Sequence, residues 1–234
     1  MYKKKSNLAL SIDVENVDQV LSISDLVSDD IVILKTHVDI LRDFNSTFIK
    51  KLRSLADERG FLIFEDRKFS DIGSTSMKQF SGGLYKISSW ADIINAHILP
   101  GQSIIDGLKS GCLGRDVGLL LVAQMSSKNN LFSKRYTKNV VNFAKDNRPF
   151  IIGLVAQEKL HLEKDLITLT PGVSFYQSHD FLGQQYSSPR HVIEAKESDI
   201  IIVGRSIYES SDPKSISSEY RKEGWKYFLK KNYI

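Results

Sequence analysis

Short apolar runs, rich in leucine or β-branched residues, recur along the whole chain. Each run is nearly continuous rather than alternating, which is typical of strands covered on both faces of a parallel sheet. The pattern therefore predicts eight buried strands, over residues 8–12, 31–34, 61–64, 92–96, 117–123, 150–155, 166–169 and 200–203.

The segments between these runs contain apolar residues at helical spacing. One such stripe covers residues 41–55 and is followed by Gly60 as a stop signal. Others cover residues 136–144 and 219–229. Strands alternating with helices over 234 residues predict an α/β fold, a (β/α)8 TIM barrel formed by residues 1–234 as a single domain.

A doubly wound open sheet has the same alternation and stays as the alternative fold. No Gly-x-Gly-x-x-Gly fingerprint follows the first predicted strand, which weakens a dinucleotide-binding version of that fold. No linker, low-complexity tract or repeat indicates a domain boundary.

Polar side chains follow nearly every predicted strand. The active site of a TIM barrel lies at the carboxyl ends of its strands, and a barrel selected for packing alone would not need such residues there. The pattern therefore favours an enzyme. The residues concerned are Asp13, Lys35-Thr36-His37, Glu65-Asp66-Arg67-Lys68, His97, Gln124 with Ser126 and Ser127, Gln157, Thr170-Pro171-Gly172 and Gly204-Arg205.

Residues 66–71 place two carboxylates around a lysine directly after the third predicted strand. Residues two apart in an extended segment point the same way, so Asp66 and Lys68 can share one face. Charges are seldom buried unless they are paired, which would make such an arrangement costly to build. A solvated charged turn is the alternative, and the spacing alone gives the two interpretations similar weight.

The residues after the seventh and eighth strands suggest a phosphate site. Barrels often bind phosphate there through backbone N–H groups, which Gly172 and Gly204 would expose, and Arg205 would add a permanent, bidentate charge. Taken alone, Arg205 could equally be a surface residue in a turn. The Gly-Arg pair makes phosphate binding the better interpretation.

Two histidines follow strands and raise the question of a metal. An ammonium group beside His37 would repel a cation, so we expect His37 and His97 to be hydrogen-bonded or packing residues and expect no metal.

Composition narrows the class of protein. Hydrophobic residues make up 41% of the chain and charged residues 26%, which is ordinary for a globular protein. The net charge of +4 fits anionic small substrates as well as nucleic acid. The clearest lysine runs are terminal, and we interpret them as solvated tails rather than a nucleic-acid site. Cys112 is the only cysteine, which fits a reducing, cytoplasmic location, and no apolar run is long enough for a signal peptide or a membrane span.

Six segments together resemble the orotidine 5'-phosphate decarboxylase family, specifically its eukaryotic-type branch. They occur in family order over essentially the whole chain. The segments are LKTHVDIL (34–41), FEDRKFSDIGST (64–75), WADIINAH (90–97), TPGV (170–173), LGQQY (182–186) and SDIIIVGR (198–205).

The resemblance implies decarboxylation of orotidine 5'-phosphate to UMP, without a cofactor, in de novo pyrimidine biosynthesis. Lys35, Asp66 and Lys68 match three members of the family's Lys-Asp-Lys-Asp array, with Lys68 as the group that stabilises and protonates the C6 carbanion. Asp71 matches the fourth member, which the family supplies, with Thr75, from the neighbouring subunit. A homodimer with shared sites is therefore implied.

The remaining matches are substrate contacts. Asp13 and Lys35 fall on positions that contact the ribose, and Ser126 on the position that reads the pyrimidine. The expected phosphate-binding set is Gln184, which also bridges toward the base, Tyr186 and Arg205, with Pro171 and Gly204 completing the substrate-binding residues.

The chain departs from the family pattern in the middle of the 171–186 loop. Residues 174–179 lack the glycine- and acid-rich composition common there. Fused family members carry an orotate phosphoribosyltransferase domain ahead of the decarboxylase. Because the first strand begins about ten residues in, we expect no such domain here, and the sequence leaves open whether the chain is free-standing or excised.

Two other functions compete with this one. A metal-dependent sugar-phosphate decarboxylase or synthase of the same superfamily shares the Asp-x-Lys-x-x-Asp motif but uses a carboxylate near the second strand to bind magnesium, where this chain has Lys35. A non-catalytic barrel that binds nucleotide phosphates is the second rival, against which the complete charged array argues.

Overall fold

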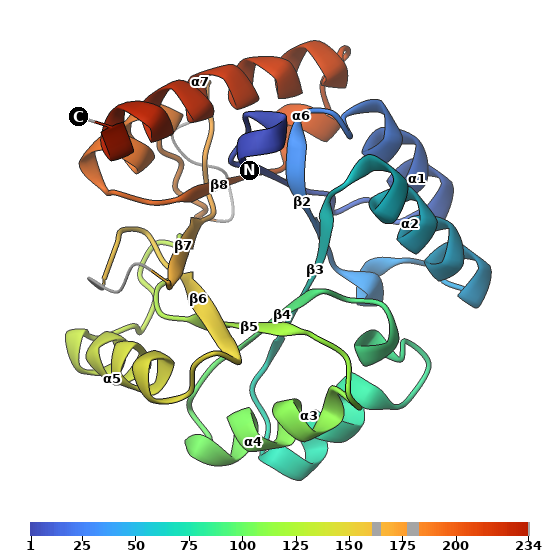
Figure 1. Cartoon of the computed structure of the whole chain (residues 1–234), viewed down its shortest axis with the longest axis vertical. Coiled ribbons are helices and arrows are strands. Elements are labelled where there is room, and N and C mark those ends of the chain that lie inside the picture. The colour runs from blue at the N-terminus through green and yellow to red at the C-terminus, as the bar shows by residue number, and fades with distance from the viewer. Residues whose placement is uncertain (161–164, 177–182, 234) are drawn as a thin grey trace.

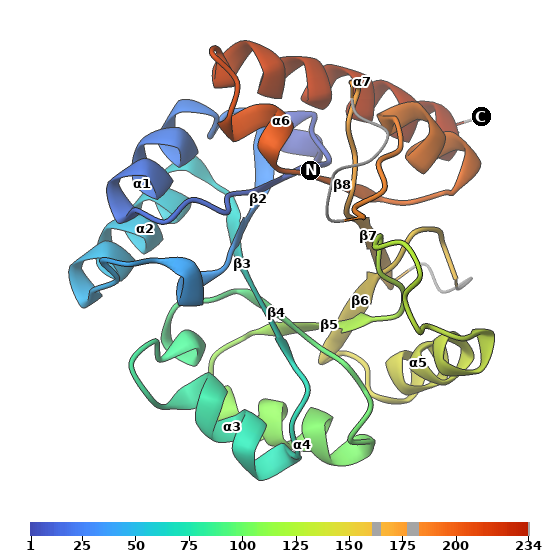
Figure 2. The same cartoon turned by 180° about the vertical axis from the view of Figure 1, so that it is seen from behind.

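The computed structural model describes residues 1–160, 165–176 and 183–233 of the chain. Eight parallel strands hydrogen-bond in sequence order and close into a barrel. Figure 1 shows the helices as an outer ring around these strands, and Figure 2 shows the same arrangement from behind. The predicted (β/α)8 barrel is confirmed, and the open doubly wound sheet is excluded.

All eight predicted strands are present, although β3 continues through the charged residues 65–68 that were predicted to follow it. Their bounds are β1 (Leu8–Ser11), β2 (Ile31–Thr36), β3 (Leu62–Phe69), β4 (Ile93–Ala96), β5 (Gly118–Val122), β6 (Ile151–Val155), β7 (Ile167–Thr170) and β8 (Ile200–Val203). The α-helices are α1 (Val17–Leu26), α2 (Ser46–Arg59), α3 (Gly73–Ser81), α4 (Gln102–Gly111), α5 (Lys134–Asp146), α6 (Arg205–Tyr208) and α7 (Pro213–Tyr233). Short 3-10 turns η1 (Tyr2–Lys4), η2 (Val38–Ile40) and η3 (Ile87–Ser89) and a π-helical turn η4 (His191–Ala195) complete the described elements.

Apolar side chains pack on both faces of the barrel wall. Ala9, Phe64, Ile93, Leu120 and Leu169 belong to a buried cluster of strand residues that fills the interior. A larger cluster lies between the strands and the helices. Because each strand is covered on both sides, its sequence is a continuous apolar run, as predicted.

The predicted helix over residues 41–55 begins later than its apolar stripe. Asn45 caps α2 by accepting a hydrogen bond from the Phe48 N–H, so the helix starts at Ser46. Leu41 and Phe44 precede the helix but still pack against the core, which is why the apolar spacing extended too far. The stop at Gly60 is confirmed, because this residue ends α2 with a φ of 68°.

Strand β3 contains a bulge at its carboxyl end. Glu65 and Phe69 pair with the two residues on either side of Asn95 in β4, so residues 66–68 lie opposite Asn95 alone. Within the bulge Lys68 has a φ of 50°, a left-handed conformation that few residues other than glycine adopt. Because of the bulge, the side chains of residues 66–68 do not alternate between the two faces as they would in a regular strand. These residues lie at the mouth of the barrel.

Across the described parts of the chain, the helices are all too short or too polar to traverse a lipid bilayer.

Candidate active site

A cavity opens at the carboxyl ends of the strands. Its walls come from β1, β2, β3, β5, β6 and β8 and from loops at this end of the barrel, including the loop that follows β7. Of the residues that the family resemblance places in the site, only Asp71 and Thr75 lie outside its walls. Those that line the cavity are Asp13, Lys35, Asp66, Lys68, Ser126, Pro171, Gln184, Tyr186, Gly204 and Arg205.

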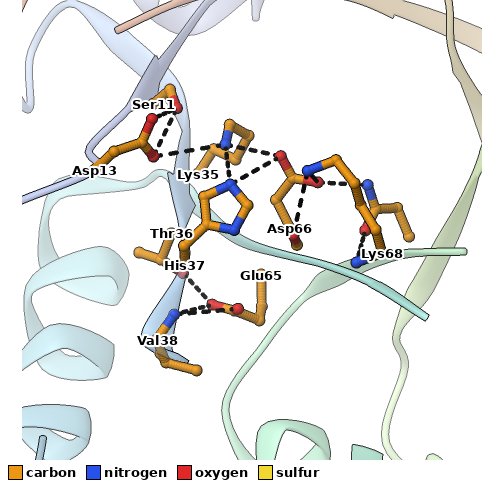
Figure 3. Close-up of polar contacts among 10 residues, drawn as sticks. Ser11, Asp13, Lys35, Thr36, His37, Val38, Glu65, Asp66 and Lys68 are labelled. Atoms are coloured by element: carbon orange, nitrogen blue, oxygen red, sulfur yellow. Dashed lines mark hydrogen bonds and ion pairs between the residues drawn. The ribbon is translucent and has the colours of Figure 1, made fainter. Parts of the chain in front are cut away.

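One wall of the cavity carries a row of alternating charges (Figure 3). Lys35 Nζ lies 2.8 Å from Asp66 Oδ2 and 3.8 Å from Asp13 Oδ1. Lys68 Nζ lies 2.7 Å from Asp66 Oδ1. Asp66 and Lys35 are only 7% and 5% exposed, so this segment is a buried, paired cluster and not a solvated turn.

The row fixes the charge state of its buried members. Burial disfavours a charged Asp66, but Lys35, His37 and Lys68 outweigh it and hold the pKa of this carboxyl well below its usual range. Burial also opposes the charge on Lys35, yet Asp66 and Asp13 raise the pKa of its ammonium above the usual value. Both residues are therefore ionised at neutral pH.

His37 also lies in the cavity wall, although the sequence analysis did not place it among the site residues. Its Nε2 lies 2.9 Å from Lys35 Nζ and 3.3 Å from Asp66 Oδ2, so it is hydrogen-bonded as expected. Its position two residues after Lys35 at the end of a strand was the available signal. His97 instead packs near the Phe132 ring, 5.9 Å away, and burial lowers the pKa of its imidazole.

Asn95 is a second residue that the sequence analysis did not assign to the site. Its Nδ2 donates to Asp66 Oδ1 at 2.6 Å, and its Oδ1 accepts a hydrogen bond from the Lys68 backbone N–H at 2.8 Å. The side chain is fully buried. A lone amide within the apolar run of β4 was the only sequence signal.

Glu65 points away from the cavity. Its carboxyl group accepts hydrogen bonds from the Thr36 hydroxyl at 2.7 Å and from the Val38 N–H at 3.2 Å (Figure 3). Full burial raises the pKa of Glu65 to about 8, against the effect of those two hydrogen bonds.

Three possible metal ligands meet near this point. One donor atom each from His37, Asp39 and Glu65 lies within 4.8 Å of the others. Both oxygens of Glu65 already accept hydrogen bonds, and His37 is engaged by an ammonium group, Lys35. These residues do not fit a metal centre, and we assign none.

A second wall, from the ends of β5, β7 and β8, is built of neutral hydrogen-bonding groups and one guanidinium. Gln184 Nε2 lies 2.7 Å from Ser126 Oγ, and the Arg205 guanidinium donates to the Tyr186 hydroxyl. Gly172 has a φ of 75°, and a Cβ there would come within 2.5 Å of Gln184 Nε2. A Cβ would also come within 2.5 Å of the Gln185 backbone carbonyl oxygen, so this close approach of the two segments requires glycine.

Asp71 and Thr75 lie beyond the rim of this cavity. Asp71 is exposed, and its Oδ1 accepts a hydrogen bond from the Ile72 N–H at 2.7 Å just before α3 begins. Thr75 is half-buried in the first turns of α3. Neither residue contributes to the cavity of its own chain, and their entry into a neighbouring site stays a prediction.

Comparisons with known proteins agree with the resemblance seen in the sequence. The family model "Orotidine 5'-phosphate decarboxylase / HUMPS family" matches residues 6–220. The orotidine 5'-phosphate decarboxylase of Phycomyces blakesleeanus is 44% identical over 99% of this chain and 88% of that protein. The uridine 5'-monophosphate synthase of Bos taurus is also 44% identical, and the chain spans 48% of its length.

The solved structures are more distant in sequence. The orotidine 5'-monophosphate decarboxylase of Methanocaldococcus jannaschii, complexed with the inhibitor BMP, superposes with a TM-score of 0.72 at 21% identity, covering 93% of this chain and 98% of that one. This likeness supports the barrel fold. The match over residues 6–220 and the identity with the fungal protein show that the chain belongs to the orotidine 5'-phosphate decarboxylase / HUMPS family.

Proposed function

We propose that this protein decarboxylates orotidine 5'-phosphate to UMP in de novo pyrimidine biosynthesis and needs no cofactor to do so. The observation that carries the proposal is the buried row Lys35–Asp66–Lys68 at the mouth of the barrel. Family membership and the names of the fungal relatives support the same reaction.

Lys68 is the proposed electrostatic and proton-donating group. Loss of CO2 from C6 leaves a carbanion that no cofactor delocalises, so the charge must be stabilised by the protein. The Lys68 side chain is 30% exposed toward the cavity while its ammonium is held 2.7 Å from Asp66. An ammonium fixed beside C6 can stabilise the developing charge and then donate its proton to that carbon.

Asp66 has two proposed roles. It orients the ammonium groups of Lys35 and Lys68, one on each of its oxygens. Because its pKa is strongly depressed, it also stays a carboxylate and would repel the carboxylate of the substrate until CO2 leaves. We rank this ground-state effect below the stabilisation of the transition state by Lys68.

The second wall would hold the rest of the nucleotide. Ser126 and Gln184 offer hydroxyl and amide groups to the pyrimidine, while Tyr186 and Arg205 offer a hydroxyl and a guanidinium to the phosphate. Asp13 and Lys35 lie where the ribose would connect the two ends, and Pro171 and Gly204 complete the wall. Binding energy from the remote phosphate can then contribute to the reaction at C6.

We further propose a cytoplasmic homodimer in which Asp71 and Thr75 complete the partner's site. Their position outside the cavity of their own chain, just beyond the end of β3, supports this arrangement. A single cysteine and the absence of any bilayer-length apolar helix among the described residues fit the location.

The decisive experiment is a turnover assay with orotidine 5'-phosphate, followed through loss of its ultraviolet absorbance. Turnover that persists in the presence of a chelator is expected. Turnover that stops with the chelator would instead favour a metal-dependent sugar-phosphate enzyme of the superfamily. The Lys35 ammonium in the buried row argues against that alternative, because it would repel a metal cation. Nucleotide binding without any turnover would indicate a non-catalytic barrel.

A further inference from the structure

We propose that Asn95 is a positioning residue for Lys68: its amide holds the bulge of β3 in the one shape that brings the Lys68 ammonium to the cavity. The inference rests on the role proposed above for Lys68. Asn95 itself is absent from the cavity lining, and it acts through its two neighbours.

The Asn95 side chain uses both ends of its amide. The NH2 group donates to the Asp66 carboxylate at 2.6 Å, and the carbonyl oxygen accepts from the Lys68 N–H at 2.8 Å. A side-chain amide can make both bonds at once because its donor and its acceptor lie on one rigid plane, and asparagine is the shorter of the two side-chain amides. The amide therefore ties the first and last residues of the bulge together.

The bulge needs these side-chain hydrogen bonds because the regular backbone pairing between β3 and β4 is interrupted there. Residues 66–68 lie opposite Asn95 alone, so the backbone of this segment lacks the usual register with β4. Lys68 in addition adopts a left-handed φ of 50°, which a non-glycine residue keeps only where its surroundings enforce it. The bond from the Lys68 N–H to Asn95 replaces a bond of the strand ladder at this unfavourable position.

The same amide fixes the direction of the charges. Asp66 Oδ1 accepts from both Asn95 Nδ2 and Lys68 Nζ, and Oδ2 faces Lys35 and His37. With one donor removed, the carboxylate can rotate and carry the Lys68 ammonium away from C6. A displacement of about 1 Å at a reacting group can cost on the order of a hundredfold in rate.

The test compares Asn95→Ala with Asn7→Ala. Asn7 is equally buried but lies at the amino end of β1, where its Nδ2 donates to the Asp199 carbonyl at 3.0 Å. Both changes remove a buried amide and should lower Tm. Only Asn95→Ala should lower kcat for orotidine 5'-phosphate, by about 10- to 100-fold, with KM changed by less than about threefold because the phosphate contacts are intact.

A second readout does not depend on turnover. Amide hydrogen exchange of the isotopically labelled protein should show the Lys68 N–H exchanging at least about tenfold faster in Asn95→Ala than in the wild type, because its acceptor is gone. Exchange in Asn7→Ala should leave Lys68 protected. If the wild type failed to decarboxylate orotidine 5'-phosphate, the proposed function would be wrong. The exchange measurement would still test the two hydrogen bonds of the Asn95 amide, which we call the Asn95 clamp.

Asn95→Asp separates the two halves of the clamp and serves if the alanine variant does not fold. It keeps an acceptor for the Lys68 N–H but replaces the amide donor to Asp66 with a second carboxyl group, so the two carboxyl groups compete for one proton and Asp66 loses part of its charge toward Lys68. Protection of the Lys68 amide should persist while kcat still falls. The proposal is overturned if kcat stays within about twofold of the wild type in both variants, if Asn7→Ala loses as much kcat, or if Lys68 exchange is unchanged in Asn95→Ala.

Discussion

Lys68 Nζ lies 2.7 Å from Asp66 Oδ1, although both residues belong to a bulge that interrupts the regular alternation of the strand. The other carboxylate oxygen, Asp66 Oδ2, forms an ion pair with Lys35 Nζ at 2.8 Å. Lys68 is thus the member of the row whose ammonium remains partly open to the cavity, at 30% side-chain exposure against 7% for Lys35.

Lys68→Ala should abolish decarboxylation while UMP still binds appreciably, because the variant loses the charge and the proton at C6 but keeps the phosphate contacts. We expect a loss in kcat of at least about ten-thousandfold, the upper end of what a general acid alone contributes, since electrostatic stabilisation is lost as well. Calorimetric titration with UMP measures the binding. Lys222→Ala, an exposed lysine of α7, is the matched control, and near-normal turnover by Lys68→Ala would refute the proton-donor assignment.

Asp71→Ala should be nearly as inactive as Lys68→Ala when each is studied as a homodimer. Mixed with exchange of subunits, the two inactive proteins should recover activity, because one of the two sites in the heterodimer then contains both native residues. About half of the dimers are mixed at equal concentrations, so roughly a quarter of wild-type activity is expected if each site acts independently. Absence of recovery despite demonstrated exchange would place Asp71 in the site of its own subunit.

Arg205→Ala should lower kcat/KM for orotidine 5'-phosphate strongly, because the phosphate loses a charge-assisted partner worth about 1.5–3 kcal/mol or more. The same change should barely affect a truncated substrate that lacks the phosphate. The ratio of the two kcat/KM losses separates phosphate binding from damage to the fold. Equal losses on both substrates would indicate that Arg205 has a structural role at the start of α6.

Glu65 should make stability depend on pH. Its pKa is about 8 in the folded protein against an ordinary 4.5, so between these values the folded state holds a proton that the unfolded chain releases. Protonated Glu65 therefore stabilises the folded state at low pH. As pH rises through that window, the free energy of unfolding of the wild type falls by at most about 1.4 kcal/mol per pH unit. Above about pH 8 this stabilising contribution is lost.

Glu65→Gln removes this titration and keeps the acceptor for the Thr36 hydroxyl. Urea unfolding at about pH 5.5, 6.5 and 7.5 should show the stability of the variant improving relative to the wild type at each step. A difference between the two proteins that does not vary with pH would show that Glu65 is already ionised when buried.

The sequence was sufficient to locate the eight strands, because burial on both faces of a barrel leaves a continuous apolar run that needs no tertiary information to recognise. It did not give the end of β3, where charged residues continue the strand. It was misleading where tertiary packing imitates a helix. Leu41 and Phe44 bury apolar surface without being helical, and the true start depends on the cap at Asn45. Helix-period spacing records which residues are buried and only indirectly which are helical.

In the site, the shared face of Asp66 and Lys68 was predicted from a regular strand, but the structure reaches it through a bulge. His37 and Asn95 were not assigned to the site. Their contacts depend on the alignment of β2, β3 and β4, which no local pattern encodes. The positions of Asp71 and Thr75 in a second subunit came from the family resemblance and stay a prediction.

The bulge in β3 determines which face of the barrel wall the last residue of the strand occupies. Three residues stand opposite one, so β3 carries two residues more than β4 over this stretch, an even number. The alternation of inward and outward side chains therefore resumes in phase after the bulge. Glu65 accepts a hydrogen bond from the Val38 N–H outside the barrel, and Phe69 packs against Phe80 of α3 on the same side of the wall. Loss of a single residue here would turn Phe69, the last residue of β3, toward the other face, whereas loss of two residues that include Lys68 would leave Phe69 in phase. The bulge therefore presents Asp66 and Lys68 to the cavity without changing which face of β3 packs on the helices.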